Sequence, residues 1–313
     1  MLRAFVLGVV QGLTEFLPIS SSAHLSIVPK LLGYAVPSLS FEIFLHFGTL
    51  LAVLAYFARD LLGFVLALVA PGRIGSGEAA VRRRLLVLLV LASVPAAVLG
   101  FLLQDWADRQ TSHPLRAAVW LVVTTSVLIA AELYARGRGP VLPVAAEAAA
   151  EGELVDRGVP GPASAGAVAA RAGRRQAASP SSAEKELERL PAGRALGIGV
   201  AQALALIPGT SRSGITISAG LFLGVTREAA ARFSFLLSIP AILGAGILKL
   251  GDLNGAGESG PELLVGFLAS AVAGFLAVSA LIRLLRTRTL WPFIWYRLLV
   301  GGAFVLLLAT VRS

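Results

Sequence analysis

Residues 11–24 read QGLTEFLPISSSAH, a short polar stretch inside an otherwise apolar N-terminus. Residues 202–214 read QALALIPGTSRSG and follow the same plan, in which an apolar helix carrying a Gln runs into a proline and then a cluster of hydroxyls. Proline removes a backbone donor and biases the preceding residue away from helix. Each stretch therefore predicts two half-helices around a break, and each half is too short to cross a bilayer.

The start of each second half-helix favours a negatively charged ligand, because its first N–H groups have no partner within the helix. We expect Ser20 or Ser21 to cap the helix after the first break. We expect Thr210 or Ser211 to cap the helix after the second.

The composition is that of a polytopic membrane protein. Hydrophobic residues make up 56% of the 313 residues and charged residues only 14%, with a mean hydropathy of +0.81. The apolar N-terminus lacks a small-residue cleavage site, which predicts mature structure and not a signal peptide. The chain has no cysteine, which excludes disulfides and thiolate chemistry. The net charge of +9 fits membrane topology better than nucleic-acid binding.

Six further apolar segments of about 20 residues each match the thickness of the hydrocarbon core. They lie near residues 39–58, 82–103, 114–135, 228–250, 262–284 and 290–311. The half-helix pairs, 2–17 with 20–33 and 193–207 with 211–224, predict re-entrant hairpins. The predicted fold is an all-α polytopic membrane protein with six transmembrane helices and two re-entrant helical hairpins.

The two halves of the chain repeat each other: Gln11 corresponds to Gln202, and Pro18 to Pro208. A unit of one hairpin and three spans crosses the membrane an odd number of times, so the second copy is inverted. The domains predicted are a first repeat at 1–136, a disordered cytoplasmic linker at 137–191 and a second, inverted repeat at 192–313. Within the linker we expect at most a short solvated helix at residues 184–189.

Arginines concentrate on one predicted side of the membrane, which the positive-inside rule makes cytoplasmic. They include Arg59, Arg73, Arg82, Arg83, Arg84, Arg136, Arg138, Arg194, Arg227, Arg232, Arg283, Arg286 and Arg288. The predicted location is a bacterial inner (plasma) membrane, with both termini outside.

Charged side chains inside a membrane are costly and therefore indicate function, and each hairpin carries one close to its break, Glu15 in the first and Arg212 in the second. An ion pair that only locks the hairpins together is the alternative interpretation. Gln11 lies on the same helical face as Glu15, and the two oxygens suit a hard cation or a water. A hydrogen bond between helices is the simpler role for Gln11.

Ser20, Ser21 and Ser22 supply hydroxyls where the second half-helix begins. One of them must cap the helix, and another could be a nucleophile with His24 as its base. We expect structural roles for three other polar residues. They are His46 in a span, His113 in an outer loop, and Arg297, whose side chain we expect to snorkel from an aromatic belt.

Residues 209–214 combine flexible backbone, hydroxyls and the Arg212 guanidinium at a helix N-terminus, which favours phosphate chemistry. The chain has neither a GxxxxGK[ST] loop nor an HExxH pair, which argues against conventional nucleotide hydrolysis and zinc proteolysis.

Together, QGLTEFLPISSSAH and PGTSRSG resemble the motifs of the undecaprenyl-diphosphatase (bacitracin-resistance) family of integral membrane phosphatases. The resemblance covers most of the spans and leaves only the linker unmatched. It implies hydrolysis of undecaprenyl diphosphate to undecaprenyl phosphate and inorganic phosphate, which recycles the lipid carrier of cell-wall peptidoglycan synthesis. It further implies an active site that faces outside and a divalent cation, Mg2+ or Ca2+.

Carried over position by position, the resemblance makes Glu15, Ser21, His24 and Arg212 the catalytic residues. Substrate binding is assigned to Gln11, Ser20, Ser22, Thr210, Ser211 and Ser213. Glu15 and Gln11 are the candidate metal ligands, although Gln11 stands where many members have Glu. Either Ser21 attacks phosphorus, or a water does so with His24 as base.

Two other functional classes remain as alternatives. Inverted repeats with broken helices also build secondary transporters or flippases for phosphorylated lipids or anions, although transport requires no nucleophile. A purely structural scaffold does not explain buried charges. Small residues permit close helix contacts, either within the chain or in a homodimer. They are Gly8, Gly12, Gly197, Gly220 and Gly224.

Overall fold

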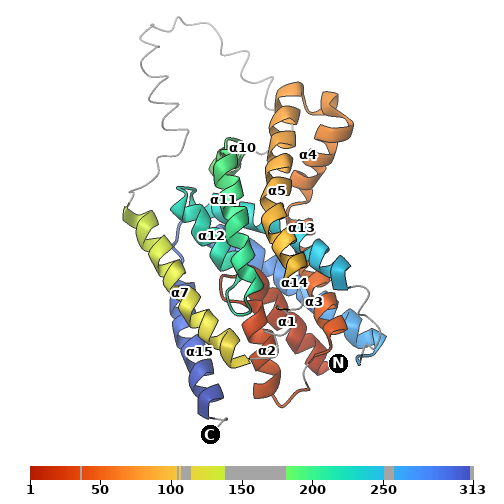
Figure 1. The fold of residues 1–313 in the computed structure, drawn as a ribbon. Helices are drawn as coiled ribbons and strands as arrows, with labels where there is room; N and C mark the ends of the chain where they lie inside the picture. The colour runs from red at the N-terminus through yellow and green to blue at the C-terminus, as the bar shows by residue number, and fades with distance from the viewer. Residues whose placement is uncertain (36, 104–105, 107–113, 138–180, 250–256, 311–313) are drawn as a thin grey trace, which may run out of the picture.

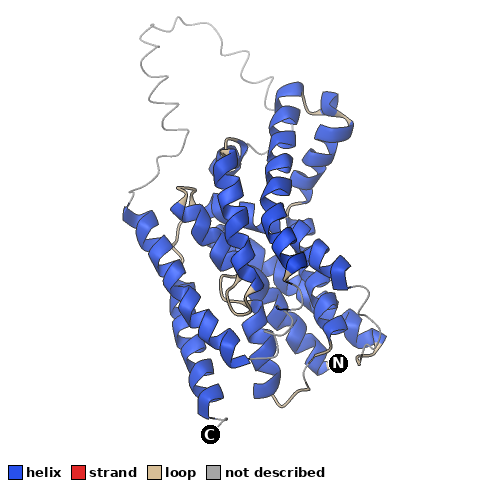
Figure 2. Ribbon diagram, viewed as in Figure 1, coloured by secondary structure: helices blue, strands red, loops and turns tan. Residues whose placement is uncertain are grey.

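The structure is a computed structural model that describes residues 1–310, except 36, 104–105, 107–113, 138–180 and 250–256. All regular structure in the described residues is helical (Figures 1 and 2). The elements are α1 (Leu2–Phe16), α2 (Ser21–Leu31), α3 (Leu39–Tyr56), α4 (Ala58–Val69), η1 (Pro71–Arg73), α5 (Ser76–Leu102), α7 (Pro114–Gly137), α10 (Ser182–Glu188), α11 (Ala192–Gln202), η2 (Ala203–Leu206), α12 (Arg212–Phe222), α13 (Arg227–Lys249), α14 (Gly260–Leu285) and α15 (Trp291–Thr310).

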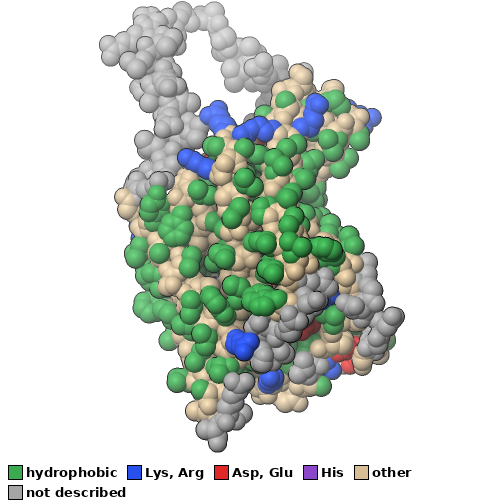
Figure 3. All heavy atoms as spheres, in the orientation of Figure 1, with side chains coloured by type: hydrophobic (Ala, Val, Ile, Leu, Met, Phe, Trp, Pro, Cys, Tyr) green, Lys and Arg blue, Asp and Glu red, His purple; other side chains and the backbone are tan. Residues whose placement is uncertain are grey.

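Within the described residues, six helices are long and apolar enough to cross a membrane: α3, α5, α7, α13, α14 and α15. They coincide with the six predicted spans to within a few residues. Hydrophobic side chains cover the middle of the face seen in Figure 3, and Lys and Arg side chains lie toward its two ends. The chain is therefore a multi-pass, all-α membrane protein.

Both predicted breaks are present, and the prolines account for them. The residue before each proline has extended backbone, with φ −66° and ψ 143° at Leu17 and φ −80° and ψ 115° at Ile207. The chain leaves α1 and η2 there and begins a new helix at α2 and α12. The helix–break–helix units are confirmed, and their re-entry into a bilayer stays a prediction.

The two halves interleave, because α1 packs on α14 and α11 packs on α5. A Cβ atom added at Gly8 would lie 2.5 Å from the Gly266 carbonyl oxygen, and one at Gly12 would lie 2.6 Å from the Cβ of Ala273. These glycines therefore serve close helix packing within the chain. The homodimer stays a prediction.

The end of the predicted linker is folded, which corrects the assignment of 137–191 as disordered at its C-terminal end. Residues 138–180 lie outside the described residues, but α10 begins at a capping box between Ser181 and Glu184. The predicted short helix is present, yet only one of its faces is solvated, because Ala183 and Leu187 are buried, as is Leu190 just after the helix. This apolar stripe at helical spacing gives α10 a face that packs on α5 and α13.

Candidate active site

The two breaks share an unusual backbone conformation. Ser20 and Ser211, with φ of 73° and 67°, are the non-glycine residues with positive φ in the described part of the chain. Each is the N-cap of the following helix: Ser20 Oγ accepts from the Ala23 N–H at 3.5 Å, and Ser211 Oγ accepts from the Gly214 N–H at 3.1 Å. Ser20 and Ser211 are therefore the caps, as one of the two alternatives at each break predicted. Strained backbone of this kind is typical of functional sites.

The two breaks are joined by hydrogen bonds in both directions. The Gly209 N–H donates to Ser22 Oγ at 3.0 Å, and Ser213 Oγ donates to the Leu17 carbonyl oxygen at 3.0 Å. Two residues predicted to bind substrate, Ser22 and Ser213, thus tie one hairpin to the other. The tie fixes the start of α2 against the start of α12.

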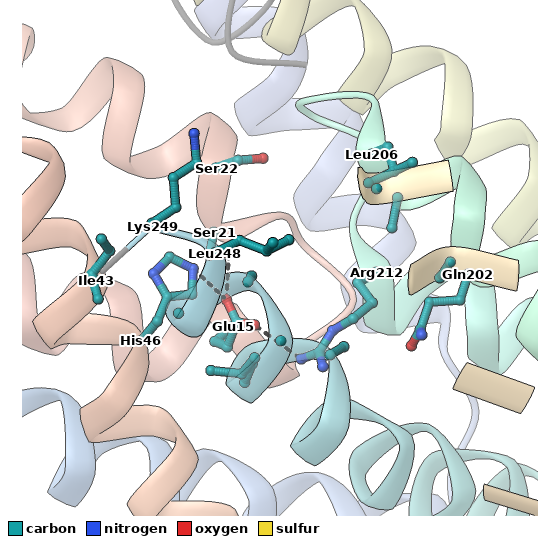
Figure 4. Close-up of a pocket in the computed structure, with 18 of the residues that line it drawn as sticks. Glu15, Ser21, Ser22, Ile43, His46, Gln202, Leu206, Arg212, Leu248 and Lys249 are labelled. Atoms are coloured by element: carbon teal, nitrogen blue, oxygen red, sulfur yellow. Dashed lines mark hydrogen bonds and ion pairs between the residues drawn. The ribbon is translucent and has the colours of Figure 1, made fainter. Parts of the chain in front are cut away.

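Glu15 is the centre of the polar cluster that these contacts bring together (Figure 4). Arg212 Nη2 lies 2.9 Å from Glu15 Oε1, in an ion pair whose side chains are only 13% and 8% exposed. Ser21 Oγ donates to Glu15 Oε2 at 2.7 Å, and Gln11 Nε2 donates to the same oxygen at 3.1 Å. The structure therefore brings together four of the predicted site residues, Gln11, Glu15, Ser21 and Arg212.

His46 also belongs to this cluster, which corrects its assignment to a structural role. Its Nε2 lies 3.7 Å from Glu15 Oε2 and its Nδ1 donates to the Glu42 carbonyl oxygen at 2.7 Å. The bond at Nδ1 fixes the tautomer and turns Nε2 toward the carboxylate. The local sequence around His46 is apolar and gave no signal, because the contact forms only when α3 packs beside α1.

His24, predicted to be catalytic, is placed elsewhere. It is buried, with Nδ1 2.7 Å from the Ser20 carbonyl oxygen and Nε2 2.8 Å from Tyr296 Oη. The carbonyl can only accept, so Nδ1 carries the proton and Nε2 accepts from the tyrosine. In this structure His24 links the strained Ser20 backbone to Tyr296 on α15, and it does not contact Glu15.

Arg297 is fully buried, which corrects the expectation that it snorkels. Its guanidinium donates to the Pro18 carbonyl oxygen at 3.0 Å and to the Leu121 carbonyl oxygen at 2.9 Å. It also donates to Thr125 Oγ1 at 2.8 Å and to Thr124 Oγ1. A buried cation with this many acceptors fixes structure around it, so Arg297 holds the first break against α7.

A cavity of about 490 Å3 opens beside the cluster. Of the predicted site residues it is lined by Glu15, Ser20, Ser21, Ser22, Ser211 and Arg212. His24, Thr210, Ser213 and Gln11 are not among its lining residues, although Gln11 contacts Glu15 from behind. His46, Glu42 and Lys249 complete the charged part of the wall, and the rest is mainly apolar.

Two side chains that line this cavity carry buried polar atoms without a hydrogen-bond partner in the described residues. The atoms are Arg212 Nη1 and both amide atoms of Gln202. Gln11 Oε1 and Thr210 Oγ1 are also unpartnered, but their residues do not line the cavity. Buried polar atoms are nearly always satisfied in folded proteins, so the exceptions in the cavity wall indicate a ligand. One edge of the Arg212 guanidinium is thus engaged by Glu15 while the other is free to bind an anion.

The chain resembles known proteins over nearly its whole length. A family model described as bacitracin resistance protein BacA matches residues 4–303. An undecaprenyl-diphosphatase of Geobacter sulfurreducens is 42% identical over 97% of this chain and 96% of its own. One of Alcanivorax borkumensis is 41% identical over 98% of both chains, and one of Synechococcus elongatus is 36% identical over 98% of this chain and 93% of its own. The chain therefore belongs to the bacitracin resistance protein BacA family.

Proposed function

We propose that this protein hydrolyses undecaprenyl diphosphate to undecaprenyl phosphate and inorganic phosphate, and so recycles the lipid carrier of cell-wall synthesis. The observation that carries the proposal is the Ser21 hydroxyl bound to the Glu15 carboxylate, beside an Arg212 guanidinium with one free edge. The names of the relatives support the same substrate. The apolar remainder of the cavity wall suits the prenyl chain.

The 2.7 Å bond from Ser21 Oγ to Glu15 Oε2 supports Ser21 as the nucleophile and Glu15 as its base. Ser21 Oγ attacks the terminal phosphorus and its proton passes to Glu15. The bond from that phosphorus to the bridging oxygen breaks, and undecaprenyl phosphate leaves. Water then hydrolyses the phosphoserine, releases inorganic phosphate and restores the hydroxyl. Arg212 stabilises the charge on the transferring phosphoryl oxygens, the main source of catalysis in such reactions.

A role for His24 as the base of an attacking water stays a prediction. Its Nε2 faces Tyr296, and its Nδ1 faces the Ser20 backbone. Direct attack by Ser21 needs no change in these contacts.

A divalent cation, Mg2+ or Ca2+, belongs to the proposal. Gln11 Oε1 is a buried acceptor without a partner, and Glu15 is a carboxylate beside it. The described residues contain no group of three or more His, Cys, Asp or Glu side chains that would hold a metal ion alone. Oxygens of the diphosphate would therefore supply the remaining ligands, as is usual for Mg2+. The cation would neutralise charge on the diphosphate.

The orientation in the membrane is also part of the proposal. Arg73 lies in η1, between α4 and α5, and Arg82 to Arg84 lie in the first half of α5. The turn between α4 and α5 is at the end of the molecule away from the two termini (Figure 1). The positive-inside rule makes that end cytoplasmic and places the termini outside. We further propose that the active site opens to that outer face, where the diphosphate product of wall synthesis is released.

Phosphate release from undecaprenyl diphosphate by the purified protein in detergent tests the proposal. Wild type should release phosphate, and chelation of divalent cations should suppress the release. Ser21→Ala, Glu15→Gln and Arg212→Ala should each lower kcat/KM by more than about a hundredfold, because each removes a group used in the transition state. Absence of release from folded wild type, together with uptake of a phosphorylated lipid into liposomes, would instead support the transporter alternative.

A further inference from the structure

Gln202 is a buried polar residue that the proposed reaction leaves unused. It closes α11, is 3% exposed and lines the same cavity as Glu15 and Arg212. Neither its Nε2 nor its Oε1 has a partner in the described residues. In Figure 4 Arg212 lies between Glu15 and Gln202, and the Gln202 amide is turned toward Arg212.

The internal repeat explains why this amide is unpaired. Gln202 corresponds to Gln11, which donates to Glu15 four residues later on the same helix face. Four residues after Gln202 stands Leu206, which offers no acceptor. The second half thus keeps the amide and lacks its partner, and a buried amide without a partner is costly unless a ligand satisfies it.

The lining of the cavity indicates which part of the ligand reaches Gln202. The charged lining residues, which include Glu42 and Lys249, come from α1, α3, α12 and α13. The wall next to Gln202 is built by α5 and η2, and no charged residue of these two elements lines it. It consists of Ser93, Ala96, Ala97, Gly100, Ala205 and Leu206. The lining from α3 and α13 also contains apolar residues, but charged side chains lie among them. An isoprenoid chain that follows the uncharged wall of α5 and η2 would place the phosphate attached to it between Arg212 and Gln202.

We propose that Gln202 binds the lipid-linked phosphate, donating from Nε2 to one of its oxygens, while Ser21 and the free edge of Arg212 engage the terminal phosphate. This inference rests on the proposed function. It makes Gln202 a substrate-binding residue that recognises the part shared by substrate and lipid product. Inorganic phosphate, the other product, does not reach it.

Steady-state kinetics of Gln202→Leu in detergent test the proposal, with undecaprenyl phosphate and inorganic phosphate as inhibitors. A hydrogen bond to a charged group is lost, so KM and the inhibition constant of undecaprenyl phosphate should each rise about tenfold. The inhibition constant of inorganic phosphate and kcat should stay near wild type. Gln202→Glu keeps the shape of the side chain and adds a negative charge, so it should raise KM and the inhibition constant of undecaprenyl phosphate further. This variant replaces Gln202→Leu in the test if the leucine variant fails to fold.

Ser218→Ala is the matched control, because Ser218 Oγ is also buried and unpartnered but does not line the cavity. It should keep the wild-type KM. Unchanged KM and undecaprenyl phosphate inhibition in Gln202→Leu would overturn the inference while the phosphatase function stands. A loss of inhibition by inorganic phosphate equal to the loss of inhibition by undecaprenyl phosphate would also overturn the inference. The substitution would then have altered the whole site and not only the binding of the lipid-linked phosphate. If wild type releases no phosphate, the proposed function fails, and binding of undecaprenyl phosphate, measured by its thermal stabilisation of each variant, decides on Gln202 alone.

Discussion

Two histidines make contacts that differ from those expected from the sequence. His24 follows the serine cluster and was expected to act on it, yet both of its ring nitrogens are bound to Ser20 and Tyr296. His46 follows no motif, yet it faces Glu15 across 3.7 Å. Local sequence predicts contacts between residues on the same turn of a helix. Contacts with a residue of another helix depend on how the helices pack and cannot be predicted locally.

The histidine contacts predict opposite effects of substitution. His46→Asn should lower turnover by about tenfold with little change in Tm, because a partly exposed side chain beside the carboxylate is replaced. His24→Ala should lower Tm clearly and turnover only slightly, because the strained backbone at Ser20 loses the hydrogen bond that supports it. Phosphate release and thermal unfolding in detergent separate the two effects.

Tyr296→Phe is the control for His24, because it removes only the hydroxyl that Nε2 accepts from. It should reproduce part of the loss in Tm. A His24→Ala protein with native Tm, no turnover and a fully active Tyr296→Phe counterpart would make His24 catalytic after all.

At the scale of elements, the breaks were predictable because proline, capping hydroxyls and glycine act locally. The partners of the breaks were not. Arg297 reaches Pro18 from the last helix, and nothing in the aromatic surroundings of Arg297 distinguishes a buried guanidinium from a snorkelling one. The linker helix shows the same limit, because its polar composition gave no sign that Ala183 and Leu187 form a buried apolar face on α10.

Gly209 is the position in the second break where a side chain should be least tolerated. It has φ of +93°, and an added Cβ atom would lie 2.1 Å from the Ala117 carbonyl oxygen. Gly209→Ala should therefore destabilise the protein by more than about 2 kcal/mol and reduce turnover as α12 moves away from α2. Gly302→Ala, on α15 with open space around the new methyl group, should be neutral in the same unfolding assay. Equal stability of the two variants would contradict the close approach.

Because α10 packs on the core, we expect the C-terminal end of the predicted linker to contribute to stability. Leu187 is 2% exposed and packs in the main core cluster. Leu187→Ala should cost about 2–3 kcal/mol of unfolding free energy, as a buried leucine does. Lys185→Ala, on the exposed face of the same helix, should cost almost nothing. Equal unfolding free energies of the two variants would contradict the packing of Leu187 in the core.

For the whole molecule, the sequence predicted six spans, two broken helices and a site between them, because hydropathy and internal repetition are properties of the entire chain. It left open whether Glu15 and Arg212 only lock the halves together. The structure contains the ion pair, with 2.9 Å between Arg212 Nη2 and Glu15 Oε1. It also contains a hydrogen bond from Ser21 Oγ to Glu15, which a purely structural ion pair does not require. Stability and catalysis are therefore both expected to depend on the pair.

Exchanging the two charges separates these roles. Glu15→Arg and Arg212→Glu alone should each destabilise by about 3–5 kcal/mol, because each leaves like charges facing in a buried place. The double variant should recover most of the Tm and yet stay more than about a hundredfold less active, since the carboxylate no longer faces Ser21. Recovery of activity together with Tm would mean that the pair only locks the halves.

The contact between Arg297 and Pro18 joins the last helix of the chain to the first break. A ribosome makes Glu15 and the serines long before it makes Arg212, and it makes Arg297 later still. A nascent chain in the membrane therefore carries Glu15 and Ser21 without Arg212 at first, and then all three without the bond from Arg297 to Pro18. The two breaks are expected to reach their final arrangement only after α15 has been inserted.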